Sequence, residues 1–352
     1  MTRHRSAQPA RRDLLIGLLA VGLSALPLAA YASWTPEGRL IRDRASFTLD
    51  PPELTAPSQA AAARLRQLSP AYENAVMPLV YHGIGSGTDG EGDFAISPDR
   101  FAEHLASLRA AGMQFVTAAQ VAAAFAGGPP LPPNAVLITF DDGRTDALMW
   151  ATPLLEAAKA KATMFVIADS AAAGGAYYAP WDDLEEVDHV WDIQSHTAAL
   201  HVEQEVGNGP SLPALTSRAE GESLDDYRRR VKADLDRADA AVDRHTGRAP
   251  VAFAYPFGAY GGDERTNDTR LRLALAEELQ GRYQLAFHQD GQDGIRLALP
   301  TGDRLGVRRL EVGDWTGAEL VRRIAACARR TYEVEPGAPP SVTVPEAAVS
   351  PS

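Results

Sequence analysis

Two short polar clusters in this sequence carry residue types that can do chemistry. In the first, Val136-Leu137-Ile138-Thr139-Phe140-Asp141-Asp142-Gly143, two adjacent carboxylates and a glycine follow an apolar run of strand length. The second, Ser195-His196-Thr197-Ala198-Ala199-Leu200-His201, offers two imidazoles. Two histidines and one carboxylate, with positions left open for water, form a frequent ligand set of catalytic metal ions. The two clusters together therefore predict a divalent metal with a second carboxylate beside it.

The spacing of the two histidines limits how they can act together. His196 and His201 are five residues apart, which places them about 140° apart on a helix. On a strand they would face opposite sides. Both can bind one ion only if the chain turns between them, as at a corner between a strand and a helix, and the hydroxyl of Thr197 suits such a corner. Taken singly, each cluster also has an ordinary structural interpretation: a strand with an Asp-Gly turn, and polar residues after a strand.

The elements that position these clusters alternate between strand and helix. Unbroken apolar runs with Val and Ile predict parallel strands buried on both faces, and polar residues at their carboxyl ends are where such folds keep their chemistry. Besides the strand over 136–140, strands are expected at 76–82, 114–116, 162–168, 190–194, 250–255, 283–287 and 306–312. Helices are expected at 98–111, 121–125, 146–161, 182–187, 224–245, 271–279 and 316–332. This alternation predicts an α/β fold with a parallel sheet or barrel.

Composition and charge exclude several classes of protein. The chain has 352 residues, of which 45% are hydrophobic and 23% charged, as in globular proteins. Its single cysteine, Cys327, excludes an intramolecular disulfide framework and a thiolate metal cluster. The net charge is −12, and residues 1–32 contribute four arginines and one aspartate, so the remainder carries −15. Such a surface predicts no nucleic-acid partner, because phosphates require Lys and Arg.

The first 32 residues read as an export segment. Basic residues precede a nearly apolar run from Leu14, and Ala30-Tyr31-Ala32 has the small-x-small pattern of a signal-peptidase site. Arg11-Arg12 also fits a twin-arginine signal. The competing interpretation is an uncleaved membrane anchor, since the run approaches the roughly 20 residues that span a bilayer. Both interpretations predict an exported protein, secreted or attached to the cell envelope.

The rest of the chain divides into three parts. Residues 33–74 read as a spacer with one short helix over 59–68. Residues 75–332 hold the alternating strands and helices and form the predicted functional domain. Residues 333–352, rich in Pro, Ala, Val and Ser, read as a disordered tail.

Taken together, the motifs resemble those of the polysaccharide deacetylases of carbohydrate esterase family 4, which share the NodB-homology fold. Thr139 to Gly143 resembles the first motif of that family, Ser195 to His201 the second, and Tyr255-Pro256-Phe257-Gly258 the third. The spacing of the histidines is like that of the branch containing poly-β-1,6-N-acetylglucosamine deacetylases. The resemblance implies a distorted (β/α) barrel over roughly residues 75–330.

The resemblance also implies roles for these residues. Asp142, His196 and His201 would bind the metal, usually Zn²⁺ in this family, with Co²⁺ or Ni²⁺ as alternatives. Asp141 would be the general base, and the backbone N–H of Phe257 would stabilise the oxyanion. Tyr255, Pro256, Gly258, Asp314 and Trp315 would contact substrate, with Asp314 also contacting the acid histidine.

Two points depart from a simple match to the family. The acid is a histidine in a Leu-x-x-His motif, and both Leu79-Val80-Tyr81-His82 and Leu285-Ala286-Phe287-His288 fit it. The branch named above places this motif on the first strand, which favours His82. Ala254 stands where the family has an arginine that supports the base, so the sequence leaves open what orients Asp141. For Asp314 the alternative is a helix cap before Thr316.

The expected function is therefore metal-dependent removal of N-acetyl groups from the N-acetylhexosamines of an extracytoplasmic polysaccharide. A peptidoglycan or chitin-type substrate is the alternative among enzymes. A non-catalytic sugar-binding relative and a phosphoesterase are the alternatives from other classes. A phosphoesterase would need a basic pocket, and Arg144 is the one basic residue beside the motifs in the sequence.

Overall fold

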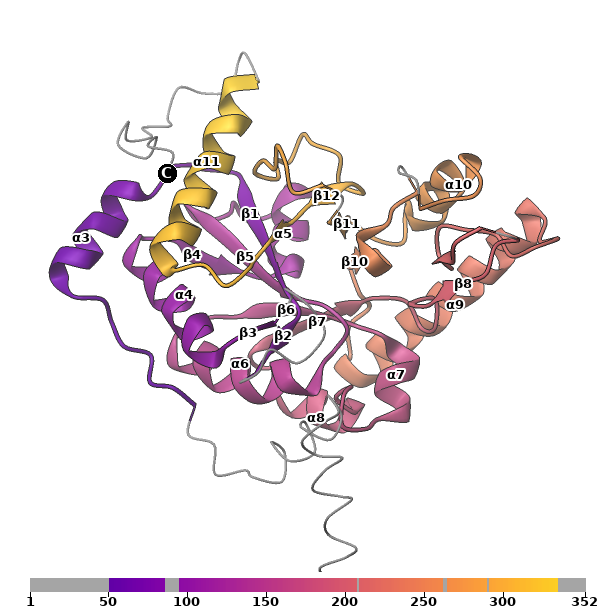
Figure 1. Cartoon of the computed structure of the whole chain (residues 1–352), viewed down its shortest axis with the longest axis horizontal. Helices are drawn as coiled ribbons and strands as arrows, with labels where there is room; N and C mark the ends of the chain where they lie inside the picture. Colours follow the sequence, from indigo (N-terminus) through magenta and orange to yellow (C-terminus); the bar gives the residue numbers. More distant parts are fainter. Residues whose placement is uncertain (1–50, 86–94, 208, 262–264, 290, 335–352) are drawn as a thin grey trace, which may run out of the picture. The chain divides into compact units, whose positions relative to one another are not determined.

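The computed structural model describes residues 51–85, 95–207, 209–261, 265–289 and 291–334. The predicted export segment, the first part of the spacer and nearly all of the predicted tail lie outside these residues. Within the described ranges, no helix combines the length and the apolar character that crossing a membrane requires. The element labels below are those of Figure 1.

Every strand pair of the main sheet is parallel. Apolar runs fill the central strands β1 (Val76–Tyr81), β5 (Ala135–Phe140) and β6 (Ala162–Val166), in which every residue is buried. Together with β4 (Gln114–Val116), β7 (Trp191–Ser195), β10 (Ala252–Ala254) and β11 (Leu285–His288), they form a sheet whose order is β12-β11-β10-β7-β6-β5-β1-β13. β4 pairs with the first half of β5. Burial on both faces explains why these strands are uniformly apolar rather than alternating.

The two ends of this sheet meet in sequence and close it into a barrel. β12 (Val307–Arg308) pairs with β11, and β13 (Leu310–Glu311) pairs with β1. Only Arg309 separates β12 from β13 in the chain. Counted as one interrupted strand, the pair closes the described sheet into a ring of seven strands, with β4 paired to β5 outside the ring. The predicted strand over 306–312 is confirmed, with an interruption at its centre.

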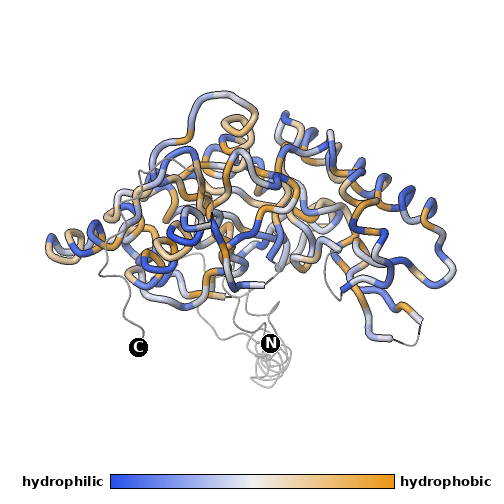
Figure 2. Tube along the Cα trace, turned by 90° about the horizontal axis from the view of Figure 1, so that it is seen from above, coloured by the Kyte–Doolittle hydropathy of each residue, from blue (hydrophilic) through white to orange (hydrophobic). Residues whose placement is uncertain are grey.

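Helices surround the barrel, as predicted. They are α3 (Gln59–Leu68), α4 (Pro98–Ala110), α5 (Ala118–Phe125), α6 (Thr145–Ala157), α7 (Ala168–Ala173), α8 (Trp181–Glu186), α9 (Leu224–Thr246), α10 (Arg270–Leu279) and α11 (Gly317–Val334). α3, α4 and α11 pack together, and α9 packs against α10 and β7 (Figure 1). Figure 2 shows hydrophilic and hydrophobic residues alternating along the helices, as expected of helices with one face on a core. Two short strand pairs, β2 (Gly83–Ile84) with β3 (Ala95–Ile96) and β8 (Glu203–Gln204) with β9 (Leu212–Pro213), lie apart from the sheet.

Apolar side chains fill the lower part of the barrel. One buried cluster takes residues from β1, β5, β6, β10, β11 and β12, among them Leu137, Phe165, Ala254 and Phe287, and α5 contributes to the same cluster. A second cluster between the barrel and the helices contains Tyr81, whose ring stacks on that of Phe140 at 5.3 Å between centroids and meets that of Phe101 edge-on at 5.2 Å. With both layers apolar, polar side chains gather at the carboxyl ends of the strands.

The predicted boundary of the domain at residue 75 is too late. Residues 51–74 were expected to be part of a spacer, but their described structure packs on the barrel. Leu65 and Leu68 of α3 are buried against the core, and the Tyr72 hydroxyl donates to the Ala135 carbonyl oxygen at 2.9 Å. The sequence of this segment has no sustained apolar period, so its few anchoring side chains were not recognised.

Candidate active site

The predicted catalytic residues converge on the carboxyl ends of the strands. His82 follows β1, Asp141 and Asp142 follow β5, and His196 follows β7. They line one pocket of about 570 Å³. The described residues that line it are His82, Asp141, Asp142, Arg144, Tyr177, His196, His201, Phe257, Arg265, Gln289 and Glu311. Segments more than 200 residues apart in sequence thus supply a single cavity.

The three predicted metal ligands lie together at the base of this pocket. Oδ1 of Asp142 is 3.4 Å from Nε2 of His196 and 3.4 Å from Nε2 of His201. One ligand atom from each of the three residues lies within 4.8 Å of the others. A tetrahedral ion with bonds of about 2.0–2.1 Å separates its ligand atoms by roughly 3.3 Å. The donor types and their spacing therefore fit a divalent ion such as Zn²⁺.

Hydrogen bonds behind the ligands fix their orientation. Nδ1 of His196 contacts the Ala254 carbonyl oxygen at 2.8 Å, which leaves Nε2 to face Asp142. The carboxylate of Asp234 on α9 accepts the backbone N–H groups of Ala198 and Ala199 at 2.9 and 2.8 Å. These two amides belong to the turn that joins His196 to His201. The predicted turn is confirmed, but the segment leads through a loop to β8 and not into a helix.

The pKa shifts of Asp142 and His201 favour metal binding, whereas His196 holds its proton more firmly than an ordinary histidine. Burial opposes ionisation of Asp142, but hydrogen bonding and charge from His196 and His201 outweigh it and lower the pKa of Asp142. Burial also disfavours a charged His196, whereas Asp142 and Asp141 raise the pKa of His196 above its ordinary value. Burial and the neighbouring His196 lower the pKa of His201 to about 4. An ionised carboxylate beside an imidazole that stays neutral suits metal binding, which requires deprotonated ligands.

Asp141 is held by an arginine that the sequence motifs did not reveal. Nη1 and Nη2 of Arg309 donate to the two carboxylate oxygens of Asp141, each at 2.6 Å. Burial raises the pKa of Asp141, but the charge and hydrogen bonds of Arg309, together with the charges of His196 and His82, outweigh burial and lower the pKa of Asp141. A signal was available in the sequence: alternation along the predicted strand places Val307, Arg309 and Glu311 on one face. The sequence alone does not show which carboxylate this arginine meets.

The structure distinguishes the two histidines considered for the acid. His82 lines the pocket. His288 instead contacts the Gly306 carbonyl oxygen through Nε2 at 3.2 Å and stacks on Tyr260, and burial lowers the pKa of His288 to about 4. His288 is therefore largely neutral near neutral pH and is not among the described residues that line the pocket. This placement favours His82.

Only one residue of the third motif faces the pocket. Phe257 is 39% exposed and its ring lies 4.4 Å from that of His201. Among the described residues, no acceptor pairs with its backbone N–H. Tyr255, Pro256 and Gly258 were expected to bind substrate but are buried, and the Tyr255 hydroxyl donates to the Leu305 carbonyl oxygen. Their place is beneath the pocket, where they shape the turn that presents Phe257.

Asp314 and Trp315, predicted to contact substrate, are not among the described residues that line the pocket. The Asp314 carboxylate accepts a hydrogen bond from Arg100 at 2.8 Å. The Trp315 ring lies under the guanidinium of Arg323 at 4.0 Å, and its carbonyl oxygen contacts His104. Both residues sit after the end of β13, beyond Glu311, and the short loop there turns toward α4 and α11. Glu311, three residues earlier in the chain, lines the pocket instead.

The rim also carries charged and aromatic residues that the motifs did not identify. Arg144 pairs with Asp146 at 2.7 Å and lies over the Tyr177 ring at 4.5 Å. Arg265 donates to the Phe257 carbonyl oxygen at 2.6 Å. The pocket is therefore more basic than the sequence suggested, but these guanidinium groups have partners within the protein.

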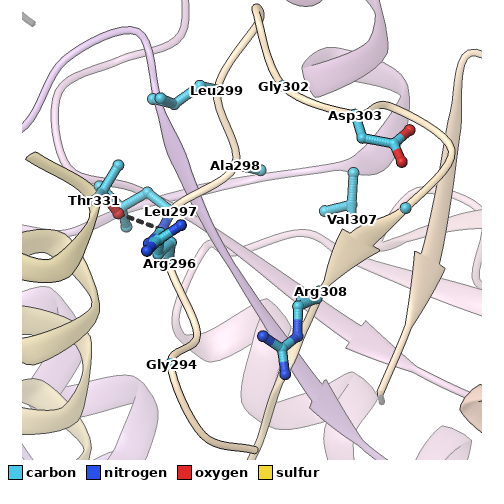
Figure 3. Close-up of a pocket in the computed structure, with 11 residues that line it drawn as sticks. Gly294, Arg296, Leu297, Ala298, Leu299, Gly302, Asp303, Val307, Arg308 and Thr331 are labelled. Atoms are coloured by element: carbon cyan, nitrogen blue, oxygen red, sulfur yellow. Dashed lines mark hydrogen bonds between the residues drawn. The ribbon is translucent and has the colours of Figure 1, made fainter. Parts of the chain in front are cut away.

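A second cavity, of about 260 Å³, is separate from this site. It lies between the segment 294–306, β12 and α11, and Figure 3 shows Arg296, Asp303 and Arg308 at its edge with the Leu297 amide bonded to Thr331. It contains none of the predicted catalytic or metal-binding residues.

Comparisons with known proteins agree with the geometry of the site. Residues 128–275, which include both aspartates, both metal-site histidines and Phe257, match the family described as polysaccharide deacetylase. The chain contains a polysaccharide deacetylase domain. It is 26% identical over 211 residues to a poly-β-1,6-N-acetyl-D-glucosamine N-deacetylase of Escherichia coli K12, across 54% of this chain. It is 32% identical over 120 residues, or 34% of this chain, to the putative polysaccharide deacetylase YxkH of Bacillus subtilis.

These curated relatives are longer than the part that matches. The alignments cover 31% of the E. coli protein and 41% of the Bacillus protein, so the chain corresponds to less than half of either. The substrates of those longer proteins therefore serve only to support a proposal about this polysaccharide deacetylase domain.

Solved structures confirm the barrel fold of this deacetylase domain. A de-N-acetylase from Aggregatibacter actinomycetemcomitans superposes with a TM-score of 0.60 at 22% identity, covering 71% of this chain and 99% of the other. IcaB from Ammonifex degensii gives 0.54 at 25% identity, covering 70% and 96%. The predicted distorted (β/α) barrel of the polysaccharide deacetylase type is thus confirmed.

Proposed function

We propose that this protein is a metal-dependent N-deacetylase that removes acetyl groups from N-acetylhexosamine residues of an extracytoplasmic polysaccharide. The observation that carries the proposal is the group Asp142, His196 and His201, whose ligand atoms converge beside the carboxylate of Asp141 in one pocket. A metal site with an adjacent carboxylate outside the ligand set is the arrangement that hydrolysis of an amide by activated water requires.

Each group in the pocket has a place in the hydrolysis. A bound divalent ion would polarise the acetamide carbonyl and make water a better nucleophile at neutral pH. Asp141, ionised and next to the ligands, would accept the proton of the attacking water. The Phe257 N–H would donate to the oxygen that becomes negative, and removing such a donor typically costs about 2.7–4 kcal/mol of transition-state stabilisation. His82, which also lines the pocket, would protonate the departing nitrogen.

The proposed substrate is a neutral glycan of the poly-β-1,6-N-acetylglucosamine type. The E. coli relative is named for that polymer, and the acidic net charge of −12 is compatible with a neutral or cationic glycan rather than a nucleic acid. Tyr177 at the rim offers a ring face for a sugar. Peptidoglycan and chitin-type oligomers remain the alternative substrates. The basic, apolar first 32 residues support export, either with cleavage or with attachment to the membrane.

The test measures acetate release from defined acetylated oligomers by the Zn²⁺-loaded protein. We expect release from β-1,6-linked N-acetylglucosamine oligomers, loss on chelation, and recovery with Zn²⁺ or Co²⁺. Asp141→Asn should lower turnover by a factor of roughly 10²–10⁴ while the metal is retained. Asp182→Asn, which changes an exposed carboxylate of α8, is the matched control.

Two other outcomes would replace the proposal. Metal and glycan binding without acetate release from any glycan would identify a sugar-binding relative. Release of phosphate from phosphorylated sugars, dependent on the same three ligands, would identify a phosphoesterase.

A further inference from the structure

Arg309 occupies a position that no motif of the sequence explains. It is the single residue between β12 and β13, where the barrel closes, and its side chain is fully buried. Its backbone N–H donates to the His288 carbonyl oxygen at 3.1 Å, which keeps it in register with the neighbouring strand. Its guanidinium passes inward at 5.5 Å from the Phe165 ring centroid and ends at Asp141.

The contact with Asp141 is a two-point contact with further support on either side. Both carboxylate oxygens accept from Arg309 at 2.6 Å. Nη1 also donates to Oγ1 of Thr139 at 3.1 Å, and Nη2 lies 3.3 Å from Oε1 of Gln289. Two parallel hydrogen bonds from a planar fork fix both the position and the rotation of a carboxylate, whereas one bond fixes only its distance. Asp141 is itself 2% exposed, so little water is available to hold it in the absence of the arginine.

Asp141 needs this support because the next residue, Asp142, belongs to the proposed metal site. Asp142, the next residue, is directed at the two histidines, and its φ of 73° turns the backbone sharply between the two carboxylates. A carboxylate beside a strained turn and a cationic centre can rotate toward the ion. It would then become a ligand and could no longer accept a proton from water. A guanidinium that occupies both oxygens from the opposite side resists this rotation.

We propose that Arg309 is the positioning residue of the general base: it holds Asp141 apart from the metal ligands and in the orientation needed to accept a proton. The inference rests on the proposed function, in which Asp141 is the base. It assigns the support of the base to the strand that closes the barrel, and not to the strand that carries the third motif.

The experiment compares Arg309→Ala with a matched neighbour, Arg308→Ala. Arg308 belongs to the same strand, but its guanidinium bonds to the Gly291 carbonyl oxygen outside the catalytic pocket. We expect Arg309→Ala to lower kcat by about 100-fold, the lower end of what a general base contributes, with KM within threefold of the Arg308→Ala value. The affinity for Co²⁺ and the absorption spectrum of the Co²⁺-loaded protein should stay unchanged, because the three ligands are intact.

A guanidinium supplied from position 254 should restore activity to the Arg309→Ala variant. Ala254 belongs to the same buried cluster as Phe165, beside which the Arg309 side chain runs, so an arginine at 254 can enter the space left by Arg309→Ala. We expect the double variant Arg309→Ala/Ala254→Arg to recover at least tenfold in kcat over Arg309→Ala. Where Arg309→Ala does not fold, Arg309→Lys takes its place, since an ammonium keeps the charge but cannot bridge both oxygens.

Three results would overturn the inference. The first is a kcat for Arg309→Ala within threefold of the control, and the second is loss of Co²⁺ binding together with activity. The third does not depend on turnover: a crystal structure of Zn²⁺-loaded Arg309→Ala with the Asp141 carboxylate unmoved. A wild-type protein that releases acetate from no glycan would instead contradict the proposed function, and the crystal structure would still decide the role of Arg309.

Discussion

Three residues at the mouth of the barrel hold backbone conformations that L-amino acids disfavour. Asp142, Thr197 and Phe257 have φ values of 73°, 71° and 56°, and each follows the end of a different strand. Each such residue costs on the order of 1–3 kcal/mol, and a β-branched residue such as Thr197 is an outlier among them. At these three places the chain must turn within one residue so that adjacent groups face different targets. The strain is located where the proposed ligands and the proposed oxyanion donor are presented.

At the scale of single residues, the two histidines that fit the acid motif also differ in their surroundings. We predict that His82→Ala lowers turnover by a factor of roughly 10²–10⁴ and leaves the affinity for Zn²⁺ within threefold, because His82 lines the pocket but is not one of the three ligands. His288→Ala is the matched control and should keep turnover within about fivefold. Steady-state acetate release and calorimetric Zn²⁺ titration measure both. The opposite ranking of the two variants would make His288 the acid.

At the scale of elements, one helix supports the segment that carries both histidines. α9 presents Asp234, which is 3% exposed, to two consecutive amides of the turn between His196 and His201. The turn has no regular secondary structure in the described residues, and it is held by Asp234 and by the backbone N–H groups of Ala168 and Asp169, which donate to its carbonyl oxygens. Groups that hold metal ligands from behind commonly change metal affinity by about 10–100-fold when they are replaced.

We therefore predict that Asp234→Asn weakens Zn²⁺ binding by about tenfold, since an amide can accept at one oxygen only and its NH₂ group would face a backbone N–H. Asp243→Asn, at an exposed position of the same helix, should bind Zn²⁺ as the wild type does. Competition with a chromogenic chelator measures both affinities. Equal affinities would show that the turn keeps its shape without α9.

Elements also show what the sequence could and could not predict. The apolar strands and the residues directly after them were predictable, because burial on both faces leaves a continuous pattern and the polar ends stand out. The interruption of the strand at Arg309 was not predictable. Strand propensity does not reveal that the buried guanidinium of Arg309 pairs with Asp141, which lies 168 residues away in the chain. The prediction for Asp314 and Trp315 fails for a related reason. A motif gives the order of residues along the chain, whereas the short loop after Glu311 decides which way their side chains face.

For the whole molecule, the segment before the first strand belongs to the folded unit. Leu65, Leu68 and Tyr72 are each less than 9% exposed and pack on a core shared with α4 and α11. Burial of each large side chain contributes roughly 1.5–3 kcal/mol. The predicted domain, which starts at residue 75, omits all three.

We expect a chain that starts at residue 75 to melt roughly 10 °C or more below one that starts at residue 51, because the loss sums to several kcal/mol. Leu65→Ala in the longer chain is the intermediate case and should cost about 2–5 kcal/mol. Calorimetry of the Zn²⁺-free proteins measures all three. Equal melting temperatures would mean that residues 51–74 only rest on the barrel.

Arg309 follows both aspartates and both metal-site histidines in the chain, so synthesis reaches it after them. A growing chain, or one truncated before β12, can therefore carry the complete ligand set with an unsupported base. On the role proposed for Arg309, the protein becomes catalytic only after β12 pairs with β11 and β13 pairs with β1 to close the barrel. Unfinished products would bind the ion yet leave the glycan intact.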